Sequence, residues 1–238
     1  MFVAAAVCPS PPLLVPGLAP QLDDDIEHLR AACAGAVAAM LEATPDVVLC
    51  VGDGPDLRWY DESDGGTLRR FGVDARAGGQ RSPALPLALT IGAWLLDRAP
   101  WRGPRRYIAL PQETTADHCV ETGRTAASAD LRVGVLAMGD GSAKRGTGAP
   151  GYLDERAGPF DAEVAAALGG PDPQWLADGL PPLVCAELWV AGRTAWQFLA
   201  GAATQAPQHS TPAARLHYDA APFGVGYFVA TWVSRQVA

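Results

Sequence analysis

The residues best suited to chemistry lie in loops that directly follow short apolar runs. The run Val133–Met138 leads into Gly139-Asp140-Gly141-Ser142-Ala143, where a carboxylate and a hydroxyl are flanked by glycines. Glycine permits positive φ and a close approach of the backbone to a ligand. The amides of Gly141, Ser142 and Ala143 are therefore a candidate for a small anion-binding nest, and a tight glycine turn is the alternative.

Two other apolar runs end in a similar way. Residues 2–7 stop at Cys8-Pro9-Ser10-Pro11-Pro12, whose prolines forbid helix and sheet ladder and hold Ser10 in a rigid loop. Residues 46–51 close on Gly52-Asp53-Gly54-Pro55. Because ligands of open α/β sheets bind at the carboxyl ends of the strands, we expect these loops to line one cleft. The candidate binding-cleft residues are Ser10, Asp53, Gly54, Asp140, Gly141 and Ser142.

Histidines elsewhere in the chain are weaker candidates. The four are His28, His118, His209 and His217. His28 lies in an amphipathic helix pattern and His209 in a polar loop, which leaves His118 and His217 as candidate site residues. His118 follows Asp117 at a predicted helix start, which is more typical of a capped surface pair than of a catalytic dyad. No catalytic residue and no metal ligand is assigned.

Alternating strands and helices must position these loops. Apolar residues at spacings of three and four predict a long amphipathic helix between the first two strands. Its inner face holds Leu22, Ile26, Leu29, Cys33, Val37 and Met40. A strand–helix–strand order implies parallel pairing. Further strands are predicted at residues 106–110, Val133–Met138, 214–218 and 225–233, and the last is expected to be central because it is apolar on both faces.

The remaining segments are predicted as follows. The polar, glycine-rich residues 56–81 indicate an excursion or a hairpin, and Ser82-Pro83 opens a helix through residue 98. Another helix begins at Pro159-Phe160 and stops at Gly169-Gly170. Residues 185–203 are predicted as one helix. Its polar residues Glu187 and Arg193 are candidate functional residues, and a helix cap and an exposed cation are the alternative explanations.

Composition and charge narrow the class of protein. A chain of 238 residues, 49% hydrophobic and 18% charged, suits one α/β domain over residues 1–238. A net charge of -8 without a basic stripe argues against a nucleic-acid partner. The apolar residues 84–96 are too few to span a bilayer, so no membrane partner is expected. Five cysteines without a CxxC pair predict buried thiols, and with no signal sequence recognised we expect a cytoplasmic protein.

Several of these motifs occur together in one known superfamily. They are Cys8-Pro9-Ser10-Pro11-Pro12-Leu13-Leu14, Gly52-Asp53-Gly54, Gly139-Asp140-Gly141-Ser142-Ala143 with Gly151-Tyr152-Leu153-Asp154, and Pro222-Phe223-Gly224-Val225-Gly226-Tyr227. With them the chain resembles an actinobacterial branch of the class III extradiol ring-cleavage dioxygenase superfamily, which includes the catalytic subunit of protocatechuate 4,5-dioxygenase and the Memo-like proteins. The resemblance spans nearly the whole chain. It implies an α/β fold with a mostly parallel central sheet flanked by helices.

The resemblance also defines where a metal would be bound. Active members hold ferrous iron with two histidines and a glutamate. The first histidine comes from a His-Pro-Pro-like loop after the first strand, where this chain has Ser10. The second comes from the loop after the second strand, where it has Gly52-Asp53-Gly54. Serine and glycine cannot replace imidazole as ligands. The resemblance therefore implies an extradiol dioxygenase-like protein with a degenerate iron site, for which no cofactor is expected.

Three functions remain open. The one we favour is binding of a small molecule or a partner in the ancestral cleft without a metal. The second is an enzyme, either an active metal-dependent ring-cleavage oxidoreductase or a hydrolase with altered ligands. A site made of Asp53, Asp140 and a histidine would favour Mg or Mn over iron. The third is a subunit that associates with an active partner or with copies of itself.

Overall fold

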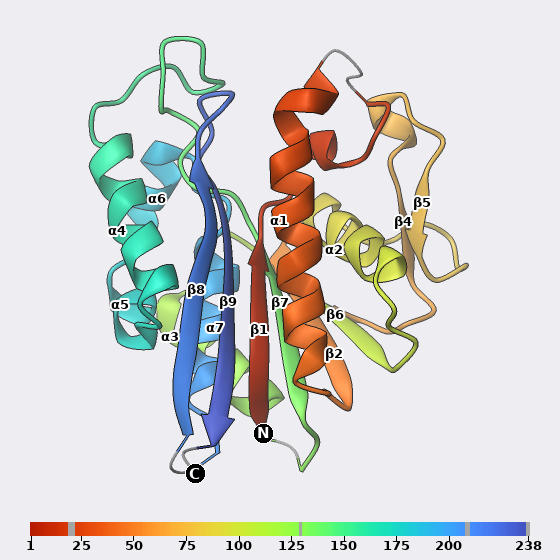
Figure 1. Ribbon diagram of the computed structural model, residues 1–238. Helices are drawn as coiled ribbons and strands as arrows, with labels where there is room; N and C mark the ends of the chain where they lie inside the picture. The colour runs from red at the N-terminus through yellow and green to blue at the C-terminus, as the bar shows by residue number, and fades with distance from the viewer. Residues whose placement is uncertain (19–21, 129, 208–209, 237–238) are drawn as a thin grey trace.

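A mixed seven-stranded sheet forms the centre of the protein. The computed structural model describes residues 1–18, 22–128, 130–207 and 210–236 (Figure 1). The strand order is β3-β6-β2-β7-β1-β9-β8. The bounds are β1 (Phe2–Cys8), β2 (Val47–Asp53), β3 (Arg58–Tyr60), β6 (Arg105–Leu110), β7 (Val133–Met138), β8 (Ser210–Ala220) and β9 (Tyr227–Gln236). Strands β6, β2, β7 and β1 are parallel, whereas β3, β9 and β8 pair antiparallel at the two flanks.

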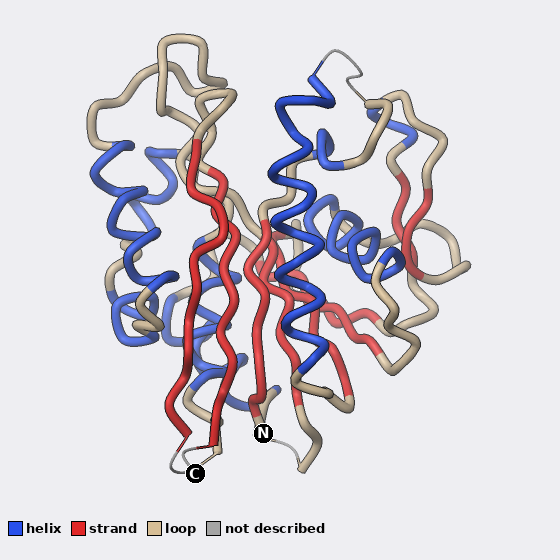
Figure 2. The backbone as a smooth tube through the Cα atoms, viewed as in Figure 1, coloured by secondary structure: helices blue, strands red, loops and turns tan. Residues whose placement is uncertain are grey.

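Helices cover both faces of this sheet (Figures 1 and 2). One face carries α1 (Asp23–Glu42) and α2 (Leu87–Arg98). The other carries α3 (Ala116–Ala126), α4 (Ala157–Gly169), α5 (Pro173–Asp178), α6 (Pro182–Leu188) and α7 (Arg193–Ala203). Successive strand residues point to opposite faces, so Ala5 and Val7 of β1 join one core and Ala4 and Ala6 the other. The prediction of an α/β fold with helices flanking a central sheet is confirmed, with a mixed sheet.

The predicted strands are present, each within a few residues of its expected bounds. The first strand and Val133–Met138 are buried along their whole length, as their continuous apolar runs indicate. Strand β9 lies between β1 and β8 and is therefore central, as predicted. The polar excursion contains a small hairpin of β4 (Gly65–Thr67) and β5 (Arg76–Gly78). All five cysteines are buried free thiols.

Two helix predictions were wrong at their boundaries. The helix expected from Ser82 begins only at Leu87, because Pro86 keeps the preceding residue extended and the amides of Ala84 and Leu85 donate to the Gly65 carbonyl. The single helix predicted over residues 185–203 is two helices, α6 and α7.

The break between α6 and α7 has a clear cause in the loop after β7. Trp189 adopts the left-handed conformation at φ 59° and ends α6. The carbonyl of Leu188 accepts from Ala143 N–H, and Gly192 N–H donates to the carbonyl of Asp140. These bonds replace the ones that a continuous helix would make. No described helix is long and apolar enough to cross a membrane.

Candidate functional site

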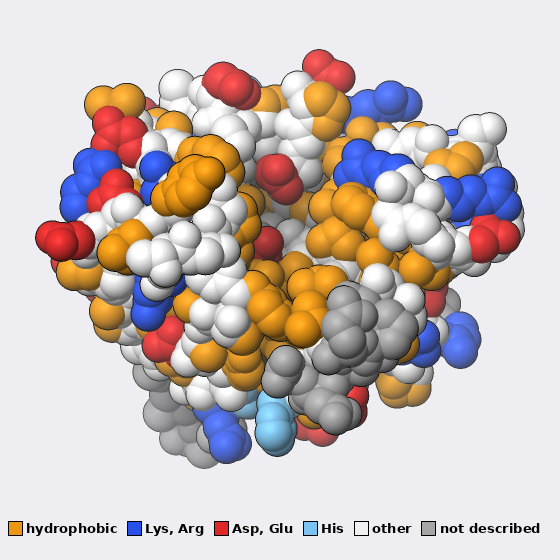
Figure 3. Space-filling view, turned by 90° about the horizontal axis from the view of Figure 1, so that it is seen from above, with side chains coloured by type: hydrophobic (Ala, Val, Ile, Leu, Met, Phe, Trp, Pro, Cys, Tyr) orange, Lys and Arg blue, Asp and Glu red, His pale blue; other side chains and the backbone are white. Residues whose placement is uncertain are grey.

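A cavity of about 610 Å³ opens at the carboxyl edge of the parallel strands. Seen from above, acidic side chains lie in a hollow that hydrophobic side chains surround (Figure 3). The cavity is lined by Ser10, Pro11, Pro12, Asp53, Gly54, Pro55, Tyr60, Arg70, Ala84, Leu85, Pro86, Leu87, Ala88, Asp140, Ala191, Val225 and Tyr227. The structure thus brings together four of the predicted cleft residues, Ser10, Asp53, Gly54 and Asp140.

Hydrogen bonds between neighbouring loops fix Asp140 in this cavity. The backbone N–H of Ser10 donates to Oδ1 of Asp140 over 2.7 Å. The N–H of Gly139 donates to the carbonyl of Cys8 over 3.0 Å, which continues the pairing of β1 with β7 into the loops. The rigid proline loop after β1 therefore holds the carboxylate that follows β7.

The two carboxylates of the cavity are both costly to ionise. The pKa of Asp140 is raised from 3.8 to about 7, chiefly by burial; the hydrogen bond from the Ser10 N–H opposes this shift, and the charge of Asp53 adds to it. Burial also raises the pKa of Asp53, opposed by a hydrogen bond from its own backbone amide. Near neutral pH, Asp140 can therefore hold or release a proton.

Three hydroxyl groups share the cavity with these carboxylates. Ser10 and Tyr60 are each 6% exposed and Tyr227 is 3% exposed, and all three line the cavity. Among the described residues none of these hydroxyls has a hydrogen-bond partner. None of the three hydroxyl oxygens is a buried atom left without a partner, so each reaches the open space of the cavity and is available to a bound molecule.

Gly54 is required for packing at the edge of the cavity. A Cβ there would lie 2.7 Å from the Cβ of Ala109 and 2.9 Å from Cγ of Pro86. Only glycine lets the loop after β2 approach the neighbouring strand and α2 this closely. Gly54 thus shapes the cavity with its backbone.

The candidate anion-binding nest is not open to a ligand. The N–H groups of the loop after β7 are already bonded within the protein: Gly141 donates to the carbonyl of Gly226, and Ala143 to that of Leu188. Ser142 donates from both its N–H and its hydroxyl to the carboxylate of Asp161. Gly141 and Ser142 therefore lie behind the cavity and hold the loop in place.

Asp161 is a buried residue that the sequence reasoning missed. Its side chain is fully buried in α4 and accepts from Ser142 and from Arg145, whose Nη1 lies 3.0 Å away. Burial raises its pKa, and the hydrogen bonds from Ser142 and Arg145 act against this. The sequence shows Asp161 only as an acid in the first turn of a predicted helix. A carboxylate at that position is already explained by its favourable interaction with the helix dipole.

The other candidate residues lie away from the cavity. His118 lines a separate depression with Trp59 and Arg106. His217, on the edge strand β8, is 2.9 Å from the hydroxyl of Thr231 on β9, and His28 is exposed on α1. His209 lies outside the described residues. Among the described residues no group of three or more His, Cys, Asp or Glu side chains could hold a metal ion.

Glu187 and Arg193 have structural roles. Glu187 is exposed and pairs with Arg156 over 2.7 Å. Arg193 is not an exposed cation, one of the two explanations considered for it, since only 1% of it is accessible. Its guanidinium donates to the carbonyls of Gln112 and Thr114 and to Oε1 of Gln197. Arg193 therefore fixes the loop after β6 to α7.

A smaller cavity of about 240 Å³ adjoins the main one. Asp53 and Ala191 line both cavities, and Trp189 lines the smaller one. Trp189 is 55% exposed, and Nζ of Lys144 lies 5.8 Å from its ring centroid. The break between α6 and α7 thus presents an aromatic side chain in the cavity that Asp53 also lines.

Comparison with known proteins finds similarity to solved structures. No protein-family model matches the chain, and no curated protein matches its sequence. The crystal structure of the uncharacterized protein JW3007 from Escherichia coli K12 matches over 97% of this chain and 99% of that chain, with 14% identity and a TM-score of 0.47.

Proposed function

We propose that this protein binds a small molecule in the cavity at the carboxyl edge of its sheet, on an extradiol dioxygenase-like fold that does not use iron. The observation that carries the proposal is the convergence of Asp53 and Asp140 with three unpartnered hydroxyls in one cavity of about 610 Å³. Concave, mostly apolar cavities with a few polar groups are typical ligand sites. The superfamily assignment rests on the sequence motifs alone.

The side chains of the cavity do not fit an extradiol iron site. Iron of this class needs two imidazoles and a carboxylate on one face. The cavity lining contains carboxylates, hydroxyls and apolar groups, and none of its described residues is a histidine. The resemblance would place the two histidines at Ser10 and in the loop Gly52-Asp53-Gly54, and the absence of histidine at both supports binding without iron.

The proposal is tested with a metabolite screen on the full chain. Ligand-observed NMR would identify binders to the native protein, and Asp140→Asn would be screened in parallel. Asp56→Asn is the matched control, since Asp56 is an exposed aspartate on the loop after β2 that does not line the cavity. We expect at least one metabolite to bind the native protein and the control but not Asp140→Asn. Failure to find any binder, or binding that ignores Asp140, would refute the proposal.

Proton transfer to or from the bound molecule is a second candidate function. It is favoured by the pKa of about 7 at Asp140 beside a second carboxylate, because a general acid or base works best when its pKa is near the ambient pH. A hydrolase or an isomerase would use such a pair. Turnover of a screened binder with a bell-shaped pH profile, lost in Asp140→Asn, would establish this function.

A further inference from the structure

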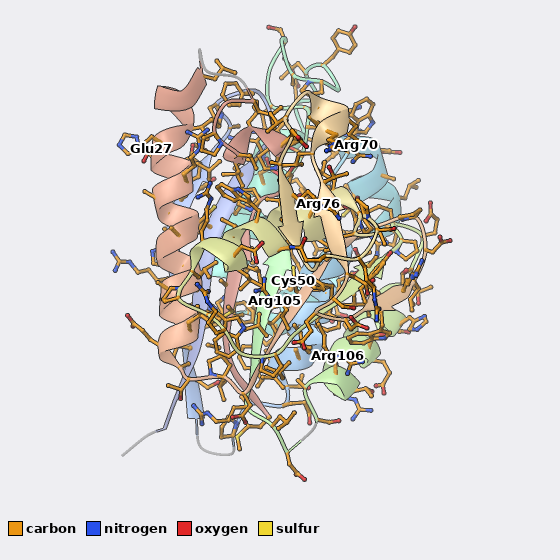
Figure 4. The ribbon with its side chains drawn as sticks, turned by 90° about the vertical axis from the view of Figure 1, so that its right-hand side faces the viewer. Glu27, Cys50, Arg70, Arg76, Arg105 and Arg106 are labelled. Carbon is orange, nitrogen blue, oxygen red and sulfur yellow. The ribbon has the colours of Figure 1, made fainter. Side chains whose placement is uncertain are left out.

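Acidic side chains outnumber basic ones among the described residues that line the main cavity. Asp53 and Asp140 both line it, and the only cation among the described lining residues is Arg70. The Arg70 guanidinium lies 4.8 Å from the ring centroid of Phe71, on the short segment between β4 and β5, and its side chain is exposed. Figure 4 shows Arg70 near the upper end of the molecule, well above Arg105 and Arg106. No described basic side chain hydrogen-bonds to either carboxylate.

The contacts of the Asp53 and Asp140 carboxylates with other described residues include no positively charged partner. Asp140 accepts one backbone N–H, from Ser10, at Oδ1. No described side chain donates to Asp53 or to Asp140. The two carboxylates also repel each other, since the charge of Asp53 raises the pKa of Asp140. A cation placed between the two carboxylates would offset both the free-energy cost of burying their charges and the repulsion between them.

The neighbouring hydroxyls provide an independent sign of a ligand. Tyr227 is 3% exposed, lines the cavity, and its hydroxyl has no partner among the described residues. Tyr60 and Ser10 share these properties. An ammonium group has three N–H donors, which two carboxylates and one hydroxyl lone pair would satisfy. The apolar wall of prolines, Leu85 and Val225 suits a carbon skeleton attached to that group.

Other classes of ligand fit the same groups less well. An anion would face two carboxylates. A divalent metal would find only these two carboxylates, since no group of three or more ligating side chains occurs among the described residues. A neutral polyol would leave the repulsion between Asp53 and Asp140 in place.

We propose that the ligand is an organic amine bound as a cation, with its ammonium group between Asp53 and Asp140 and its apolar body against the cavity wall. This inference rests on the proposed function, because it names the chemical class of the small molecule. The Tyr227 ring and the prolines would then contact the carbon skeleton, whereas the Tyr60 ring already has the Arg58 guanidinium 4.9 Å from its centroid. Aromatic faces also attract cations, which adds to the preference for an amine.

The test uses three compounds of similar size that differ in charge. Isothermal titration calorimetry at about pH 8, where both the amine and the Asp140 carboxylate are charged, would compare 2-phenylethylamine, 2-phenylethanol and phenylacetate. We expect the amine to bind at least about tenfold more tightly than the alcohol or the acid, since a tenfold ratio needs only one modest charge interaction. Asp53→Asn and Asp140→Asn should each weaken amine binding by a similar factor, while Asp56→Asn should not.

Tyr227→Phe provides a second variant that keeps the ring and the charges. It should weaken amine binding severalfold, and near-UV circular dichroism would verify that each variant is folded. Equal affinity for the alcohol and the amine, unchanged amine affinity in both Asn variants, or no binding of the amine would overturn the inference. If the metabolite screen still returned an Asp140-dependent ligand that is not a cation, the proposed function would stand and the amine inference alone would fall. If the screen also returned nothing, both would fall.

Discussion

Asp140 is held where its negative charge is unfavourable. The rigid proline loop fixes it through the Ser10 N–H, while burial and the charge of Asp53 raise its pKa to about 7. A folding requirement alone would be met by a neutral side chain that accepts the same hydrogen bond. Retaining a carboxylate here costs stability, and such costs are typical of functional sites.

Asp140→Asn is therefore expected to stabilise the free protein at alkaline pH. The pKa of Asp140 is about 7 in the folded protein against an ordinary value of 3.8, so the folded state binds more protons between these pH values and loses stability as the pH rises through them. Asparagine still accepts from the Ser10 N–H. We expect a gain of roughly 1 to 3 kcal/mol at about pH 8 and little gain at about pH 4.

Urea unfolding of the native protein and of Asp140→Asn at these two pH values would measure the difference. Asp56→Asn should show no pH-dependent gain, because Asp56 is exposed. A gain for Asp140→Asn that is equal at both pH values would contradict the assigned pKa. Ligand binding should be lost in the same variant, so stability and binding would change in opposite directions.

At the scale of elements, the loop after β7 is organised by α4 and by the segment before β9. The carboxylate of Asp161 binds Ser142 and Arg145, and the carbonyl of Gly226 accepts from Gly141. These contacts come from residues far along the chain. They hold the backbone that carries Asp140 and leave the cavity side of the loop open.

Asp161→Ala is expected to destabilise the fold strongly. It leaves the Ser142 N–H and hydroxyl buried without an acceptor and removes the partner of Arg145. Breaking a buried pair in this way typically costs on the order of 3 kcal/mol or more. Asp154→Ala, which removes an exposed pair with Arg156, is the control and should change chemical unfolding very little. Similar effects of the two substitutions would show that Asp161 has no special role.

Trp189→Gly tests whether the break between α6 and α7 has a functional purpose. Trp189 has a positive φ that glycine adopts without strain, and its side chain is largely exposed. The free energy of unfolding should stay unchanged or rise by up to about 1 kcal/mol. Leu183→Gly, in the helical part of α6, should instead lower it by about 0.5 to 1 kcal/mol.

Binding measured on the same Trp189→Gly protein completes this test. If the smaller cavity extends the ligand site, a screened ligand should bind at least threefold more weakly to Trp189→Gly than to the native protein. Unfolding at a clearly lower denaturant concentration than the native protein would instead assign Trp189 a packing role.

Most of the strands could be predicted from sequence, whereas the partners of the loops could not. A continuous apolar run between glycines, such as Val133–Met138, indicates a buried strand whatever its neighbours are. The nest expected at Gly141 failed because its amides bond to Gly226 and Asp161, which no local pattern reveals. Arg193 is buried for the same reason, since its carbonyl partners are about 80 residues away along the chain.

At the scale of the whole molecule, the cavity is built from distant parts of the chain. The ends of β1, β2 and β7 supply Ser10, Asp53 and Asp140. The excursion after β2 supplies Tyr60 and Arg70, and the start of β9 supplies another part of the cavity wall. A site assembled in this way exists only in the folded chain. Bound ligand should therefore stabilise the whole fold.

The last prediction concerns the metal that the superfamily resemblance implies. After anaerobic loading with ferrous iron and gel filtration, the full chain is expected to retain far less than one iron per chain and to consume no oxygen with protocatechuate-type substrates. An iron site of this class needs two imidazoles and a carboxylate, and each ligand contributes several kcal/mol of affinity, with about 1.4 kcal/mol equal to a tenfold change. The resemblance would place the two histidines at Ser10 and in the loop Gly52-Asp53-Gly54, which contain none, while His118 and His217 lie elsewhere on the molecule. Elemental analysis and an oxygen electrode make the measurement, and a Ser10→His, Asp53→His double variant indicates whether the fold can still accept a metal there.

Stoichiometric iron in the native chain, with substrate-dependent oxygen uptake, would restore the dioxygenase assignment and refute binding without iron.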